Sequence, residues 1–228
     1  MGWVLDNLDL IWSLTVVHLR QSVIPIVLGF VISLPLGWVA WRFRLLRSGV
    51  VVLTGLLYTI PSLALLMILP TVTGVSFLSE TNLIVALTIY AVALMVRSVV
   101  DGLNSVDTDV RLAATAVGYG AARRLWSVDL PLAGPVLLAG LRVTAASTIA
   151  LATVGIIVGI TNLGYLFTNG FQRRIIPEVL AGMIAVVLIA LVVDLLLVLA
   201  GRLSMPWLRA QRRRSRPAPV IIVAEGAR

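Results

Sequence analysis

The side chains that could support catalysis are scarce in this sequence. Cysteine and lysine are absent, and His18 is the only histidine. The chain therefore has no thiolate nucleophile, no HExxH zinc site, and no lysine for a phosphate-binding loop of the G-x-x-x-x-G-K-[ST] type. We expect no enzymatic activity and no cofactor or metal in this chain, so any ATP-driven work would need a partner subunit.

Charges that interrupt apolar runs are the first candidates for a functional role. Asp194 lies near the end of one such run, and Arg142 lies near the start of another. A charge inside a membrane segment is costly and is usually paired or functional. Because their depths are similar, we predict an ion pair between Asp194 and Arg142, or alternatively Arg97, with a structural role.

A second polar group surrounds Pro61, where Tyr58, Thr59 and Ser62 are close in sequence. Proline removes a backbone donor and bends a helix, and polar groups at a bend suit a translocation path. The rings of Tyr58 and of Tyr90, in the next apolar run, can attract a cation. The alternative is a plain structural kink beside two packing tyrosines.

Long apolar runs must position these residues. The mean hydropathy is +1.06, and only 12% of residues are charged, against about 25% in soluble domains. Each run is close to the roughly 20 residues that cross a bilayer. The sequence predicts an all-α membrane protein, a helical bundle of five spans, at about 23–41, 49–70, 83–100, 137–160 and 179–200.

The arginines predict the orientation of this bundle. Residues 1–22 read as an interfacial helix in which His18 is an ordinary interfacial residue, and residues 201–228 read as a basic cytoplasmic tail. Cytoplasmic loops carry an excess of arginine and lysine. With the N-terminus outside and the C-terminus inside, most arginines lie on the cytoplasmic side, and only three remain outside, namely Arg20, Arg173 and Arg174.

The cytoplasmic segment 107–135 separates the third and fourth spans. Its pattern predicts a short helix over 111–117, a turn at Gly118–Gly120 where glycine permits unusual backbone angles, and a second short helix over 121–128 that Pro131 ends. We interpret it as a helix-turn-helix elbow. It either lies on lipid as a linker or docks a cytoplasmic partner.

The residue order of this elbow resembles the EAA loop of ABC-importer permeases. That pattern runs Glu-Ala-Ala, then a glycine, then Ile-x-Leu-Pro. Leu112 stands in the place of the glutamate, so the resemblance implies either weaker docking to the ATPase or docking through another polar group, for which Asp109 and Arg111 are the candidates. The matching positions are Ala113, Ala114, Gly118, Val128, Leu130 and Pro131.

The wider sequence is similar to the osmoprotectant branch of these permeases, which import glycine betaine, carnitine, choline or proline betaine. The likeness is carried by HLRQSVIPIVLGFVISLPLGW, YTIPSLALLMILP and LPLAGPVLLAGLRVTAASTIALATVGIIVG. It implies a type I ABC-importer permease of the bacterial inner membrane. The implied partners are a second permease subunit, the same or homologous, a cytoplasmic ABC ATPase that binds ATP and magnesium, an extracytoplasmic binding protein and membrane lipid, without nucleic acid.

Two alternatives remain open at this point. Permeases for methionine or another amino acid share the loop pattern, and a non-transporting membrane scaffold could use the elbow to bind a partner.

In the outer loop, Arg173, Arg174 and Glu178 would contact a binding protein or simply be solvated. Residues 160–164 read ITNLG where the branch often has a glycine-rich run, so we expect a stiffer outer end of the fourth span.

Overall fold

The computed structural model describes residues 2–207, and every regular element among them is a helix. Residues 208–228, which hold most of the predicted basic tail, lie outside the described residues. The elements in chain order are α1 (Gly2–Asp6), α2 (Leu8–Arg42), α3 (Arg44–Thr59), α4 (Ser62–Thr73), α5 (Glu80–Asn104), α6 (Thr108–Ala116), α7 (Ala121–Arg124), a π-helical turn (Leu125–Asp129), α8 (Leu130–Ala152), a 3₁₀ segment (Thr153–Val158), α9 (Gly164–Gln172) and α10 (Ile176–Ser204).

Within residues 2–207, four helical stretches are long and apolar enough to cross a membrane: α2, α5, Ala121–Val158 and α10. Helices α3 and α4 together make a fifth candidate, bent by 107° between them. The predicted all-α bundle is confirmed. The second span is broken at Ile60–Pro61 instead of running on through 49–70, because both residues have extended backbone angles, with ψ of 128° and 131°, and a proline disfavours the helical conformation of the residue before it.

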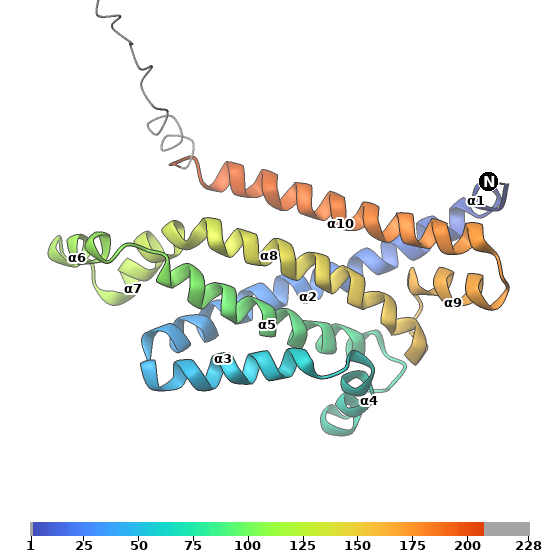
Figure 1. Cartoon of the computed structure of the whole chain (residues 1–228), viewed down its shortest axis with the longest axis horizontal. Coiled ribbons are helices and arrows are strands. Elements are labelled where there is room, and N and C mark those ends of the chain that lie inside the picture. The colour runs from blue at the N-terminus through green and yellow to red at the C-terminus, as the bar shows by residue number, and fades with distance from the viewer. Residues whose placement is uncertain (1, 208–228) are drawn as a thin grey trace, which may run out of the picture.

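Helix α5 forms the centre of the bundle, with α2 and α8 packed along it (Figure 1). These helices meet at glycines: a Cβ atom on Gly29 would lie 2.4 Å from the Cβ of Ala91, and one on Gly140 would lie 2.3 Å from that of Ser98. Small residues allow backbones to approach closely in membrane bundles. The three helices therefore form a tightly packed unit.

The first span begins earlier than predicted. Helix α2 runs without a break from Leu8 to Arg42, so the prediction of a separate helix over residues 1–22 is wrong. Leu14 and His18 are both buried, because this part of α2 packs against α8 and α10. The helix continues because its buried face continues.

The fourth span also begins earlier than predicted. Pro131 does not end the elbow's second helix, since the π-helical turn Leu125–Asp129 carries the helical path into α8. The amide of Leu130 donates to the carbonyl of Leu125. Pro131 then falls in the first turn of α8, where its missing N–H is tolerated.

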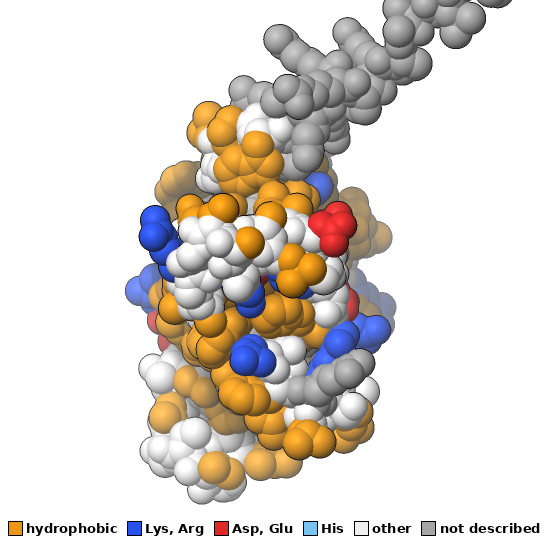
Figure 2. Space-filling model, turned by 90° about the vertical axis from the view of Figure 1, so that its left-hand side faces the viewer, with side chains coloured by type: hydrophobic (Ala, Val, Ile, Leu, Met, Phe, Trp, Pro, Cys, Tyr) orange, Lys and Arg blue, Asp and Glu red, His pale blue; other side chains and the backbone are white. Residues whose placement is uncertain are grey.

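The connections lie at two opposite ends of the bundle (Figure 1). One end holds the junction of α2 and α3, the elbow formed by α6 and α7, and the end of α10. The other end holds α1, α9 and the start of α10. Figure 2 looks onto the elbow end, where basic side chains lie among apolar ones.

Candidate functional site

The elbow is built by caps and one left-handed glycine. The side chain of Asp107 accepts a hydrogen bond of 2.8 Å from the amide of Asp109 and so caps α6. Gly118 has φ +90°, a conformation that glycine adopts at helix ends without strain. The amide of Tyr119 bonds back to the carbonyl of Ala114 at 3.0 Å. The chain thus reverses into α7 as the sequence predicted.

The predicted coupling residues divide into two groups in the structure. Ala113 and Gly118 are exposed, and nothing lies near the site of a Cβ on Gly118. Ala114 is buried, and the remaining three are partly buried against the bundle, namely Val128, Leu130 and Pro131. Ala113 and Gly118 therefore lie on the outer surface of the elbow, and the other four residues of the pattern face the rest of the protein.

Exposed apolar side chains surround the outer surface of the elbow. Leu112, Val117 and Trp126 are all more than half exposed. Each lies on α6, its end, or the π-helical turn, at the end of the molecule seen in Figure 2. An exposed apolar patch with a polar surround is typical of a protein interface.

The base of the elbow holds a buried charge that the sequence reading missed. Asp129 is 1% exposed. One of its oxygens accepts a 2.8 Å hydrogen bond from Nε of Arg111, and the other lies 3.5 Å from Nε of Arg124. The two arginines come from α6 and α7, so one carboxylate holds both arms of the elbow. We call Asp129, Arg111 and Arg124 the elbow clamp.

Arg111 also joins the elbow to two spans. Its guanidinium donates to the carbonyl of Leu103 near the end of α5, and it lies 4.7 Å from the ring centre of Trp41 on α2. A guanidinium over an indole face is attracted by the ring. The clamp therefore links α6 and α7 to α2, α5 and the start of α8.

This geometry corrects one prediction and keeps another. Arg111 was expected to be a possible contact for an ATPase, but its side chain is only 15% exposed and is turned inward. The inward turn follows from the buried carboxylate it neutralises. Asp109 is exposed on α6 and stays the predicted polar contact.

The residues around Pro61 share a kink but not a common surface. Tyr90 is 3% exposed, and its hydroxyl donates to the carbonyl of Ile60 at 2.5 Å. Its ring meets that of Tyr58 edge-to-face, with centres 6.0 Å apart. Thr59 donates to the carbonyl of Leu56.

Tyr90 does not line a translocation path as expected, because its hydroxyl donates a hydrogen bond to the carbonyl of Ile60 at the break between α3 and α4. Tyr58, Thr59 and Pro61 are exposed, and Ser62 is partly exposed. These four residues stay candidates for the path.

The structure brings Arg142 and Asp194 together. Nε of Arg142 donates to one carboxylate oxygen at 2.5 Å, and Nη2 donates to the other at 2.8 Å. The two side chains are 44% and 41% exposed. This two-bond contact joins α8 to α10. Arg97 has no part in it.

Comparison with known families places the chain. The family described as "Binding-protein-dependent transport system inner membrane component" matches residues 26–210. The chain belongs to this family. It is a membrane-embedded permease component, and the elbow and its clamp lie within the matched residues.

Relatives and solved structures agree with this placement. The permease is 31% identical over 193 residues to the choline transport system permease protein OpuBB of Bacillus subtilis, covering 83% of this chain and 86% of the relative. It is 30% identical to the osmoprotectant import permease protein OsmW of Salmonella typhimurium, covering 86% and 92%. An inward-facing structure of the MetNI methionine ABC transporter has the same fold, with a TM-score of 0.71, 24% identity and coverage of 92% and 99%.

The end of the bundle opposite the elbow holds a buried polar network. The side-chain amide of Asn162 donates to Gln21 at 3.0 Å and to the carbonyl of Ala152 at 2.7 Å. Its oxygen accepts from the amide of Gly164 at 2.8 Å. The turn after the 3₁₀ segment is therefore tied to α2 by Asn162, the central residue of ITNLG.

Two predictions about this end are wrong. His18 is fully buried instead of interfacial, and its Nε2 lies 3.0 Å from the carbonyl of Ile149. Glu178 is also fully buried, and it accepts a 2.6 Å hydrogen bond from Asn169. His18 is enclosed because this part of α2 packs against α8 and α10, and Glu178 is enclosed where α9 packs against α10. Arg173 and Arg174 are exposed.

The sequence offered a weak signal for the missed residues. Asp129 is an acid in the apolar second half of the elbow, with arginines earlier in the same segment.

Across residues 2–207, no three histidine, cysteine or acidic side chains gather in a way that would hold a metal ion.

Proposed function

We propose that this permease is a subunit of an ATP-driven importer of quaternary-ammonium osmoprotectants, such as glycine betaine, carnitine, choline or proline betaine. The observation that carries the substrate class is similarity over most of the chain to permeases named for choline and osmoprotectant transport. The chain would form the translocation path, and a separate ATPase would bind ATP and magnesium.

The elbow end would face the cytoplasm of a bacterium, with the N-terminus outside and the C-terminus inside. The support is the distribution of arginine: the junction of α2 and α3, the elbow, and the end of α10 carry basic residues at one end (Figure 2). Cytoplasmic loops of membrane proteins carry such an excess.

The exposed half of the elbow would dock into a groove of the ATPase. Its apolar side chains, among them Leu112, Val117 and Trp126, supply contact area, and Asp109 supplies a charge. Closure of the ATPases would displace the elbow. The clamp would pass that displacement to α2 and α5 through the contacts of Arg111 with Trp41 and Leu103.

The remaining partners follow from the family description and the relatives. A binding protein would deliver the substrate at the outer end, where Arg173 and Arg174 are exposed. A second permease subunit, identical or homologous, would complete the path. Tyr58, Thr59, Pro61 and Ser62 would line it at the broken span.

The test is uptake of labelled glycine betaine in cells that lack this gene and other betaine importers. The gene is restored as wild type, as Gly118→Asp or as Gly74→Asp. Both glycines have positive φ, +90° and +71°, and both face open space, so both variants place the same new charge at a left-handed position with room for a side chain. Gly74 follows α4, away from the elbow.

We expect wild type and Gly74→Asp to restore uptake and Gly118→Asp not to, at equal membrane levels. Loss of ATPase co-purification with Gly118→Asp alone would place the defect at docking. Equal uptake with all three forms would overturn the role of the elbow. Uptake of labelled methionine in place of betaine would show that the substrate is an amino acid. If no ATPase co-purified with the wild-type permease, the alternative of a non-transporting membrane scaffold would be favoured.

A further inference from the structure

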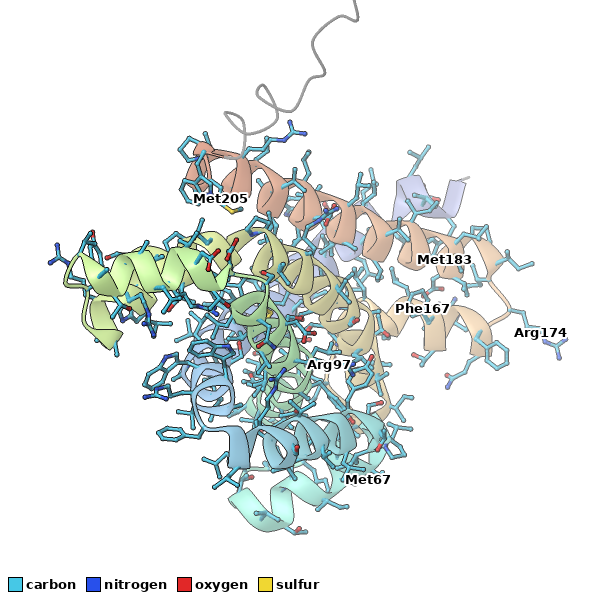
Figure 3. All side chains as sticks on the ribbon, turned by 60° about the vertical axis from the view of Figure 1, so that its left-hand side comes forward. Met67, Arg97, Phe167, Arg174, Met183 and Met205 are labelled. Atoms are coloured by element: carbon cyan, nitrogen blue, oxygen red, sulfur yellow. The ribbon has the colours of Figure 1, made fainter. Side chains whose placement is uncertain are left out.

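Helix α5 carries two opposite charges on one open face. Arg97 and Asp101 lie four positions apart, which puts them on the same side of the helix, with Asp101 nearer the elbow. Both residues are exposed, although α5 is otherwise the most buried of the candidate spans. Figure 3 shows Arg97 on α5, between α8 and the α3–α4 pair. The face that carries the two charges is therefore open to water or to a ligand.

Neither charge is neutralised by the described part of the chain. The ion pairs within residues 2–207 include neither Arg97 nor Asp101. The two do not pair with each other, and on one helix a base that precedes its acid is the less favourable order. Arg97 lies seven residues before the end of α5, about 10 Å inside the helix. An ionisable residue within a membrane span is costly and marks a functional site.

A cavity of about 370 Å³ between α5 and α8 has both charges in its wall. Two hydroxyl side chains also line it, Ser98 from α5 and Thr144 from α8. Thr144 is 1% exposed, and its hydroxyl is directed at the sulfur of Met95 at 3.9 Å, which is a weak acceptor. The hydroxyl of Ser98 makes only a long bond of 3.4 Å to the carbonyl of Leu94. Both hydroxyls are therefore available to a stronger acceptor.

The polar groups are ordered along this cavity. Thr144 meets Met95, two positions before Arg97, and Ser98 directly follows Arg97. Asp101 lies about one turn closer to the elbow. One end of the cavity thus offers a positive charge and two hydroxyls, and the other offers a negative charge. The remaining lining residues are small or apolar, namely Leu94, Val136, Ala139, Gly140 and Val143.

We propose that this cavity, which we call the α5–α8 pocket, binds zwitterionic substrates of the importer, with Arg97 at the carboxylate and Asp101 at the quaternary ammonium group. The proposal rests on the proposed function for the substrate class. A guanidinium binds a carboxylate through two parallel hydrogen bonds, and Ser98 and Thr144 supply further donors. A quaternary ammonium group has no N–H to donate, so it is held by a negative charge and apolar contact.

The α5–α8 pocket distinguishes between substrates that the proposed class groups together. Glycine betaine, carnitine and proline betaine carry a carboxylate, whereas choline carries only a hydroxyl group beside its ammonium group. Choline keeps the contact with Asp101 and leaves Arg97 without a partner. Loss of one charge-assisted contact lowers the affinity by roughly tenfold or more. Arg97 is therefore the residue that selects zwitterions over simple cations.

Thermal unfolding of the purified full-length permease with added ligand tests the pocket directly. Glycine betaine should raise the unfolding midpoint of wild type more than choline does at equal concentration and ionic strength, because a tighter ligand stabilises the folded state more. Arg97→Gln should bind betaine roughly tenfold more weakly and lose this preference, and Asp101→Asn should weaken both ligands. Arg42→Gln is the matched control, since it removes an exposed arginine at the end of α2.

Uptake in the cells described above gives a second readout. Arg97→Gln should raise the KM for glycine betaine by about tenfold and change the KM for choline less. Arg97→Lys keeps the positive charge without the two parallel hydrogen bonds, so its KM for betaine should lie between those of wild type and Arg97→Gln. Arg42→Gln should have the KM values of wild type.

The outcomes separate the α5–α8 pocket from the transport proposal. Wild-type cells that take up neither betaine nor choline would overturn the proposed function, whereas the unfolding measurement uses neither ATPase nor uptake and still tests the pocket. Wild type that betaine stabilises no more than choline would overturn the pocket, even with intact uptake. Equal stabilisation of wild type and Arg97→Gln by betaine would also overturn it, as would an equal loss of betaine and choline binding in Arg97→Gln.

Discussion

The permease uses arginine–aspartate contacts in two places, at the base of the elbow and between α8 and α10. At the elbow, the carboxylate of Asp129 is 2% exposed and holds two arginines. Between the helices, Asp194 is 41% exposed and holds one arginine through two hydrogen bonds. The same two residue types thus work in an enclosed site and in an open one.

The difference between the two sites lies in what else surrounds the charges. The elbow clamp is completed by the carbonyl of Leu103 and the ring of Trp41, so it fixes a direction as well as a distance. The pair of Arg142 and Asp194 joins α8 to a helix whose most apolar window is only 6% buried. The buried contact at the elbow therefore fixes the relative orientation of several helices, whereas the exposed pair of Arg142 and Asp194 only holds α8 and α10 together.

The largest expected effect comes from Asp129→Asn. This change leaves two arginines at the base of the elbow without their counter-charge, and breaking a buried pair costs about 3–5 kcal/mol. We expect a large drop in thermal stability of the purified permease in detergent and a loss of uptake. Asp109→Asn is the matched control for stability, since Asp109 is exposed on α6; uptake is compared with wild type only, because Asp109 is itself the proposed contact to the ATPase. Equal stability of the two variants would show that the burial of Asp129 does not contribute to the free energy of unfolding.

A smaller effect is expected for the pair of Arg142 and Asp194. Arg142→Gln and Asp194→Asn should lower the folding yield to a similar extent, and by less than Asp129→Asn, because both side chains are nearly half exposed. The double variant should be no worse than either single one, since contacting residues are not additive. Membrane yields and thermal midpoints of the three variants check this. Additive losses would mean that the two residues act separately.

The smallest effect is expected for a hydrogen bond between uncharged groups, which gives a reference for the two charged contacts. Tyr90→Phe removes the hydroxyl that donates to Ile60 at the broken span, which we expect to cost about 1 kcal/mol. Tyr58→Phe is the control, because its hydroxyl makes no hydrogen bond within residues 2–207, so it should change stability less. Thermal unfolding of both variants measures this. A larger loss for Tyr58→Phe would reverse the assignment of the two tyrosines.

The parts of the fold that follow from local sequence were predictable. Uncharged runs predicted the spans, and glycine with good capping residues predicted the elbow turn at Gly118. Depth along each run was enough to suggest that Asp194 meets Arg142 or Arg97, but did not choose between them. These inferences need only helix geometry and the thickness of a bilayer.

The other parts depend on contacts between distant segments. Asn162 contacts Gln21 across 141 positions in sequence, and His18 reaches Ile149 across 131. No periodicity within a single run reveals such partners. The start of α2 was misjudged for the same reason, because its polar residues are buried by helices that come much later in the chain.

The π-helical turn Leu125–Asp129 has a consequence for how the elbow is aimed. A π turn holds one residue more than an α turn, and one residue corresponds to about 100° of rotation around a helix. That extra residue sets the angle between the elbow and the face of α8 that points into the bundle. A one-residue deletion here would turn the exposed surface of the elbow by about that angle relative to α8.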